Sequence, residues 1–166
     1  MPKKRKQKGL SVVEFSIVAT VFFAVFFTVV DFAVYGYVKL TMQNAVREGA
    51  RYAVTGQTNL DPNNSGDRKA AILERISLSS DGLMDDVVTD IWIEDKDGNP
   101  VIELDGNGNA ILDSDGNTII SFGGAGQFIA IHIACEWPVL SPLLYPVIDS
   151  NVYTFTVSTA MKIENY

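Results

Sequence analysis

The side chains that could do chemistry in this chain are few and widely spaced. Glu14 is the one ionisable residue in the apolar run of residues 10–30. A carboxylate at the centre of a bilayer costs on the order of 2.5–3.5 kcal/mol, and less near the edge. Two roles follow from its position: Glu14 reaches the near interface, or it pairs with a dedicated cation. The single histidine, His132, lies in an alternating stretch where packing is a commoner role than catalysis.

Three Asp-Gly-Asn units are grouped in the middle of the chain, at residues 97–99, 105–107 and 115–117. Short β-type runs flank them, which favours a meander whose turns use Asp-Gly for positive φ. The alternative is a calcium site with oxygen ligands from Asp95, Asp97, Asp113 and Asp115. The EF-hand pattern fails, because Pro100 stands where glycine is required and no glutamate closes the loop.

No catalytic motif accompanies these residues. The sequence has no nucleophile elbow, phosphate-binding loop or zinc-protease motif, so we expect neither enzymatic activity nor a cofactor. Its single cysteine, Cys135, permits no intrachain disulfide and is expected to be a small buried residue. The net charge is −7, although five of the thirteen Lys and Arg residues lie in residues 3–8. An acidic body argues against nucleic acid as a partner, since phosphate contacts need clustered cations.

A membrane segment positions Glu14. Residues 10–30 would form a helix of roughly 31 Å, which matches a hydrocarbon core of about 30 Å. The basic cluster before it places the N-terminus in the cytoplasm and the body in the periplasm by the positive-inside rule. A cleaved secretory signal is the competing interpretation, but this run is longer than a usual h-region and no A-x-A site closes it. We therefore expect a single-pass inner-membrane chain.

The residues around Glu14 read KGLSVVEF, which resembles the processing site of type IV prepilins. In that family a basic leader ends in glycine, an apolar residue begins the mature chain, and glutamate is its fifth residue. Residues 29–54 resemble the TadE-like pilins of Tad (Flp) pilus systems, which carry an acidic and an aromatic residue at the helix exit before a run like QNAAREGARYA. The closing VSTAMKIE, residues 157–164, resembles the last strand of that family.

This resemblance implies that Gly9 and Leu10 flank the bond cut by a prepilin peptidase, and that Glu14 governs assembly. Cleavage would create an α-ammonium at Leu10, which the carboxylate of a neighbouring subunit could pair with at low dielectric. The implied partners are that peptidase, other pilin subunits, the inner-membrane assembly machinery and membrane lipid.

The resemblance also implies a biological role. A mature chain much larger than the Flp-type major pilins favours a minor pilin or pseudopilin, which leaves the inner membrane for an extracellular pilus used in surface attachment. The alternative is a bitopic membrane protein whose outer domain binds a ligand or a protein without forming filaments.

Beyond the membrane the helix is expected to continue to about Val54. Asp31 is expected at the membrane exit, where it could pack against the body or form an ion pair. One face of this second half has small and apolar residues at spacings of three and four, which allows close approach of a sheet or another helix. Its members are Val38, Met42, Ala45, Gly49, Tyr52 and Gly56. Another face carries Arg47 and Arg51 with Glu48 between them. These charges are either solvated or paired with buried acidic groups of the body.

The remainder reads as a small α+β body. A second helix is predicted over residues 68–78, and strands over residues 87–94, 128–137 and 152–163. The predicted fold is a long N-terminal helix packed on a small antiparallel sheet with one extra helix, as in pilins. We divide the chain into a basic leader (1–9), the transmembrane part of the helix (10–31) and an extracytoplasmic domain (32–166).

Overall fold

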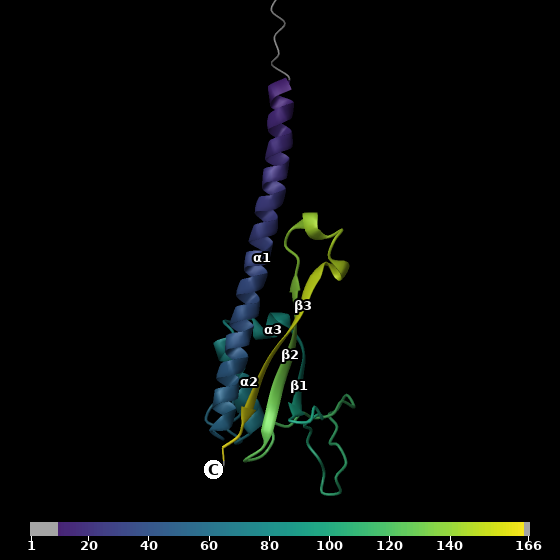
Figure 1. Ribbon diagram of the computed structural model, residues 1–166. Coiled ribbons are helices and arrows are strands. Elements are labelled where there is room, and N and C mark those ends of the chain that lie inside the picture. The colour runs from purple at the N-terminus through teal and green to yellow at the C-terminus, as the bar shows by residue number, and fades with distance from the viewer. Residues whose placement is uncertain (1–9, 165–166) are drawn as a thin grey trace, which may run out of the picture.

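A long helix, α1 (Leu10–Val54), runs past a small three-stranded sheet in the computed structural model, which describes residues 10–164 (Figure 1). Its 45 residues contain no proline, and the helix ends just before Gly56, whose φ of 65° is typical of the residues that stop helices. Arg68 covers this end by donating to the carbonyl of Ala53 at 2.8 Å and to that of Gly123 at 2.6 Å. The predicted helix and its end at Val54 are confirmed.

The sheet consists of β1 (Val88–Asp95), β2 (Phe128–Pro138) and β3 (Val152–Lys162), in the antiparallel order β1-β2-β3. Alternate side chains of β2 face the helices, and these core residues are Ile129, Ile131, Ile133 and Cys135. The predicted α+β fold is confirmed, and each predicted strand matches to within one residue at either end. Val87 was predicted as strand but ends a helical turn instead.

Two helices follow α1 before the sheet, where one was predicted. The first, α2 (Arg68–Ser79), begins at Asp67, whose side chain accepts the amides of Lys69 and Ala70. The second, α3 (Met84–Val87), is a single turn. Two 3₁₀ turns, η1 (Pro142–Leu144) and η2 (Asp149–Asn151), lie between β2 and β3.

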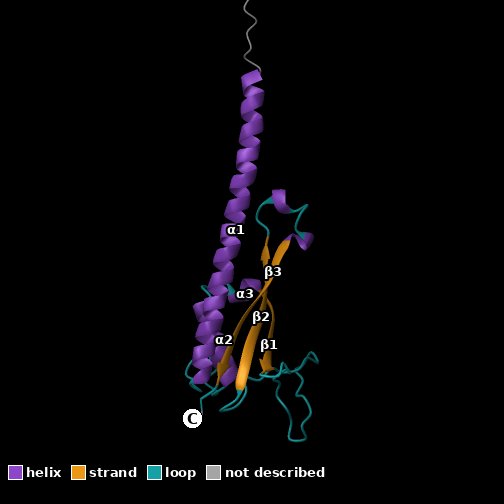
Figure 2. Ribbon diagram, in the orientation of Figure 1, coloured by secondary structure: helices purple, strands orange, loops and turns teal. Residues whose placement is uncertain are grey.

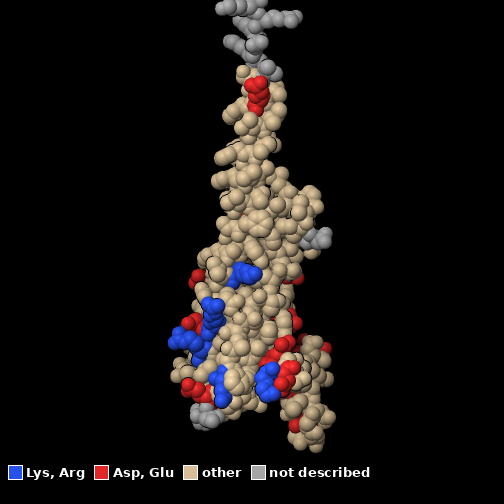
Figure 3. Space-filling view, in the orientation of Figure 1, with Lys and Arg blue, Asp and Glu red and all other residues tan. Residues whose placement is uncertain are grey.

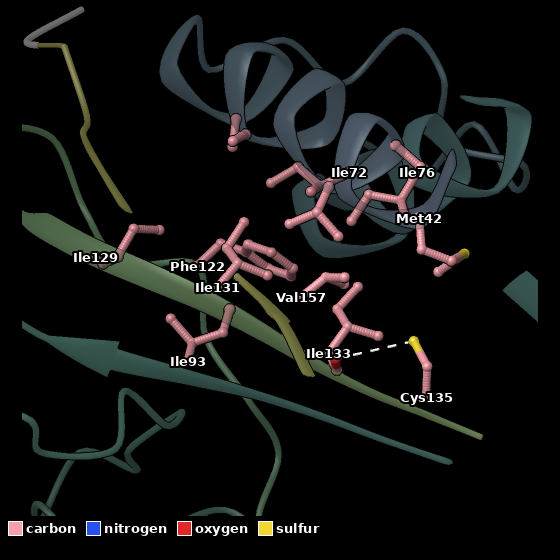
Figure 4. Close-up of a cluster of buried hydrophobic side chains, with 14 of the residues drawn as sticks. Met42, Ile72, Ile76, Ile93, Phe122, Ile129, Ile131, Ile133, Cys135 and Val157 are labelled. Carbon is pink, nitrogen blue, oxygen red and sulfur yellow. Dashed lines mark hydrogen bonds between the residues drawn. The ribbon is translucent and has the colours of Figure 1, made fainter. Parts of the chain in front are cut away.

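The core lies between the helices and one face of the sheet (Figure 4). Met42 of α1 and Ile72 and Ile76 of α2 face Ile131 and Val157 of the sheet, and all five are fully buried. The expected close-approach face of α1 is confirmed for its four buried members, and α2 is the helix that approaches it. Tyr52 is half-buried, and Gly56 lies beyond the end of the helix. A Cβ on Gly49 would lie 2.2 Å from Cγ1 of Ile76, so only glycine fits at this crossing.

The segment between β1 and β2 is a set of turns beyond the end of the sheet, drawn as loop in Figure 2. Three extended pieces pair in a closed cycle: Glu103 donates to the carbonyl of Ile119, Ile119 to that of Ile111, and Ile111 to that of Glu103, at 2.8–3.0 Å. The predicted turns with positive φ are confirmed at Gly98 and Gly116, but the glycine predicted for the middle turn is wrong. In that turn the glycine with positive φ is Gly108 at 84°, and not Gly106.

Candidate functional site

The first half of α1 is an apolar surface that the rest of the chain leaves uncovered. No residue from 11 to 30 is buried, and the large side chains exposed there include Phe15, Phe22, Phe23, Phe26 and Phe27. Within the described residues, α1 is the one helix long and apolar enough to cross a membrane. Figure 3 shows the same half of the helix as an almost uncharged surface, with the charged groups gathered on the body.

Three of the hydroxyl side chains of this half are bonded within the helix. The hydroxyls of Ser16, Thr20 and Thr28 each donate to the backbone carbonyl four residues earlier at 2.8 Å. Such bonds pair these three hydroxyls inside the helix, which suits a lipid environment. The sequence and the structure therefore agree on a single-pass membrane anchor.

Glu14 lies on this uncovered half, four residues after the start of α1, which is about 6 Å along the axis. Its side chain is exposed, and no hydrogen bond or ion pair joins it to another residue in the described part of the chain, 10–164. Gly9 lies outside the described residues, and Leu10 is the first residue of α1. The carboxylate is thus presented outward from the helix.

Asp31 is a buried hydrogen-bond acceptor at the level where α1 meets the body. Asp31 is only 1% exposed. Its carboxylate accepts the backbone N–H of Ser141 at 2.8 Å and that of Leu140 at 3.3 Å. We expected packing or an ion pair at this position. The structure shows a buried carboxylate whose hydrogen-bond partners are two amides of the β2–β3 loop.

An aromatic cluster lies beside this bond. The ring of Tyr153 on β3 contacts those of Phe32 and Tyr35 on α1, with centroids 5.8 and 4.7 Å apart, and Phe155 meets Tyr35 edge-on at 5.5 Å. Burial is the main cause of a raised pKa at Tyr153. Electrostatic interactions with Asp31 and, to a smaller extent, with Tyr35 raise this pKa further. The aspartate at the helix exit therefore contacts the β2–β3 loop, and the aromatic next to it contacts β3.

The charged face of α1 is mainly solvated. Glu48 accepts from Arg51 at 3.2 Å and from Arg75 of α2 at 3.2 Å, but the Arg51 side chain is 80% exposed. Arg47 is exposed as well. Exposed pairs of this kind contribute only about 0–1 kcal/mol to stability.

The single histidine packs on the outer face of the sheet. Its ring is stacked on that of Trp92 with the centroids 5.2 Å apart, and Nε2 of His132 lies 3.4 Å from a carboxylate oxygen of Glu94. The other Glu94 oxygen accepts from Trp92 Nε1 at 3.0 Å. The arrangement is a packed polar cluster of Trp92, His132 and Glu94.

The acidic turns use their carboxylates on their own backbone. Asp95 accepts the amides of Asp97 and Asn99, Asp105 those of Asn107 and Asn109, and Asp113 those of Asp115 and Asn117, all at 2.8–2.9 Å. The amides of Asn99, Asn109 and Asn117 respectively are the main cause of a lowered pKa at each aspartate.

The calcium alternative drew on two of these turns. Asp95 and Asp97 belong to the first turn, and Asp113 and Asp115 to the third. Across residues 10–164, no three His, Cys, Asp or Glu side chains are grouped in a way that could hold a metal ion.

Asp61 is an organising residue that our sequence analysis missed. It is 4% exposed and accepts the amides of Asn63, Ser65 and Asp67, with the Ser65 amide at 2.6 Å. These bonds, that of Asn63 first, lower its pKa from 3.8 to about 2. The Asp-Pro dipeptide in a loop rich in Asn and Gly was the available signal.

Residues 9–51 match the family model of TadE-like proteins, which confirms the resemblance over that segment and associates the chain with Tad pili. The matched segment contains Glu14, Asp31 and Gly49. No curated protein and no solved structure matches the chain.

Proposed function

We propose that this chain is a minor pilin or pseudopilin of a Tad-type pilus, stored in the inner membrane and then incorporated into, or priming, a filament used in surface attachment. The observation that carries the proposal is the uncovered apolar half of α1 with an outward-facing carboxylate four residues from its start. Such a surface requires a covering, and the bilayer and the helices of neighbouring subunits are two coverings of the same chemistry.

In the membrane state, the basic leader would stay on the cytoplasmic side and the sheet would lie in the periplasm. A prepilin peptidase would then hydrolyse the bond between Gly9 and Leu10, leaving an ammonium group at the start of α1. That group would lie near the cytoplasmic edge of the membrane, where pairing with a carboxylate is stronger than on an open surface.

In the assembly step, Glu14 of one subunit would meet the new ammonium of its neighbour. Within one chain the carboxylate is about one helical turn from the N-terminus, so subunits stacked with an axial offset bring the two groups of different chains together. An unpaired charge at this depth is penalised, and the pair would therefore fix the register of the helices more than it adds stability.

The alternative is a membrane-anchored binding domain that forms no filament. This alternative also accounts for the uncovered helix, but it provides no cationic partner for Glu14. Its closest structural support would be a pocket with convergent polar groups on the body. The acidic turns and the Asp61 loop described above instead use their carboxylates on their own backbone amides.

Incorporation into sheared pili, compared between the wild type and Glu14→Gln, tests the proposed function and the role of Glu14. We expect the variant to accumulate in membranes at the wild-type level and to fall at least tenfold in the filament fraction, measured by immunoblot. Glu48→Gln is the matched control, since Glu48 is a glutamate on the solvated face of the same helix. Equal incorporation of Glu14→Gln, Glu48→Gln and wild type would contradict the proposed role of Glu14.

A further inference from the structure

The loop that joins β2 to β3 leaves apolar side chains uncovered. Residues 138–148 read PVLSPLLYPVI and contain no charged residue. Leu140, Leu143 and Val147 are 50%, 54% and 79% exposed, although the sheet core lies close by. A water-facing loop is ordinarily polar, and a contiguous apolar surface of this kind marks an interaction site.

The loop lies beside the apolar half of α1 (Figure 1). Leu143 lines a shallow groove together with Ala24, Val25, Thr28 and Val29. Those helix residues are 14 to 19 positions after Leu10, which is about 21–29 Å along the axis. If the hydrocarbon core begins near Leu10 and is about 30 Å thick, Leu143 is at the depth of the outer leaflet.

The attachment of the loop to α1 keeps it at that depth. The two amides held by Asp31 belong to Leu140 and Ser141, at the base of the loop. The aromatic cluster of Phe32, Tyr35 and Tyr153 comes next toward the body, where the membrane interface favours such rings. On the face that Figure 3 shows, the described atoms that continue from the helix over this region are neither Lys or Arg nor Asp or Glu.

We propose that residues 138–148 are a second membrane-contacting element, whose tip at Leu143 and Val147 enters the outer leaflet of the bilayer that α1 spans. This rests on the membrane stage of the proposed function. The occupant is lipid, because the loop is seated on the spanning segment of its own chain, where acyl chains surround it before any second subunit arrives. The body is then held at a fixed height above the membrane, and leaving the bilayer requires withdrawal of both elements.

Depth-dependent fluorescence quenching of the full chain tests this. An environment-sensitive dye is attached to a single introduced cysteine at Leu143, at Val21 in α1 or at Leu104 in the distal turns, all of which are more than half exposed. The native Cys135 is 1% exposed, and burial leaves it unreactive. The protein is reconstituted in phosphatidylethanolamine and phosphatidylglycerol vesicles that contain nitroxide-labelled acyl chains.

We expect quenching at Leu143 to be within about twofold of that at Val21, and quenching at Leu104 to be several-fold weaker. Quenching at Leu143 as weak as at Leu104, with Val21 strongly quenched, would overturn the inference and leave the anchor intact. Weak quenching at all three positions would overturn the membrane stage of the proposed function as well. A photoreactive residue at Val147 adds the second arm: adducts with lipid support the inference, and adducts with a second copy alone contradict it.

Discussion

The carboxylate of Asp31 accepts the backbone N–H of Ser141 at 2.8 Å, which joins two residues 110 positions apart. One is on the helix that the membrane is proposed to hold, and the other is in the loop between the last two strands. The same carboxylate also accepts from Leu140, so it holds two successive amides at the base of this loop. The bond therefore connects the membrane segment to the body.

Replacement of Asp31 by alanine is expected to release this loop. Two amides would lose their acceptor, and a buried unsatisfied group costs about 1–3 kcal/mol. We predict faster amide hydrogen exchange at Leu140 and Ser141, by at least tenfold, in detergent or vesicles. Asp86→Ala is the control, since Asp86 is exposed on α3. Unchanged exchange in Asp31→Ala would show that other contacts hold the loop.

Replacement of Gly49 by alanine is expected to destabilise the crossing of α1 and α2. The added Cβ would lie 2.2 Å from the fully buried Ile76, and overpacking of this kind costs about 1–3 kcal/mol. In the same helix, a Cβ added at Gly36 meets nothing within 4 Å. Gly36→Ala should therefore stabilise the protein by roughly 0.5–1 kcal/mol through the higher helix propensity of alanine. Chemical unfolding followed by circular dichroism compares them, and opposite signs are predicted. Equal effects would show that α2 shifts to accept the methyl group.

The sequence was sufficient for the elements whose pattern is local. A proline-free apolar run and a face of small residues predicted α1 to Val54, and alternation predicted β2 and β3 nearly to the residue. The hydrogen-bond partners of Asp31 could not be predicted from the sequence, because local spacing carries no information about a loop 110 residues away. The register of the middle acidic turn was also missed, since Asp105 begins a turn that contains two glycines and either one fits the pattern.

That ambiguity gives a matched pair of substitutions. Gly108 has a φ of 84°, where an L side chain costs roughly 1–2 kcal/mol, whereas Gly106 has no positive φ. Neither glycine has a heavy atom within 4 Å of an added Cβ, so conformation alone separates them. We predict that Gly108→Ala speeds exchange of the Asn109 amide and that Gly106→Ala does not. The reverse result would support the turn predicted from the sequence, in which Gly106 has the positive φ.

The loop organised by Asp61 is expected to depend on pH in the acid range. The folded pKa of about 2 lies below the usual value, so this contribution to stability is present above about pH 4 and is lost as pH falls through about 2. Asp61→Asn should lower the thermal midpoint at pH 5, and its difference from wild type should shrink toward pH 2. Comparison with Asp61→Asn removes the effects of Asp95, Asp105 and Asp113, which titrate in both proteins. A difference that stays constant with pH would contradict the assignment.

The central claim is that the chain is a processed pilin subunit, and the state of its N-terminus tests it most directly. The measurement is the intact mass and N-terminal sequence of protein from membranes of strains with and without the prepilin peptidase. We predict a chain that begins at Leu10 when the enzyme is present and retains residues 1–9 when it is absent. An uncleaved chain beginning at Met1 in both strains would contradict the account and leave a membrane-anchored domain that does not assemble.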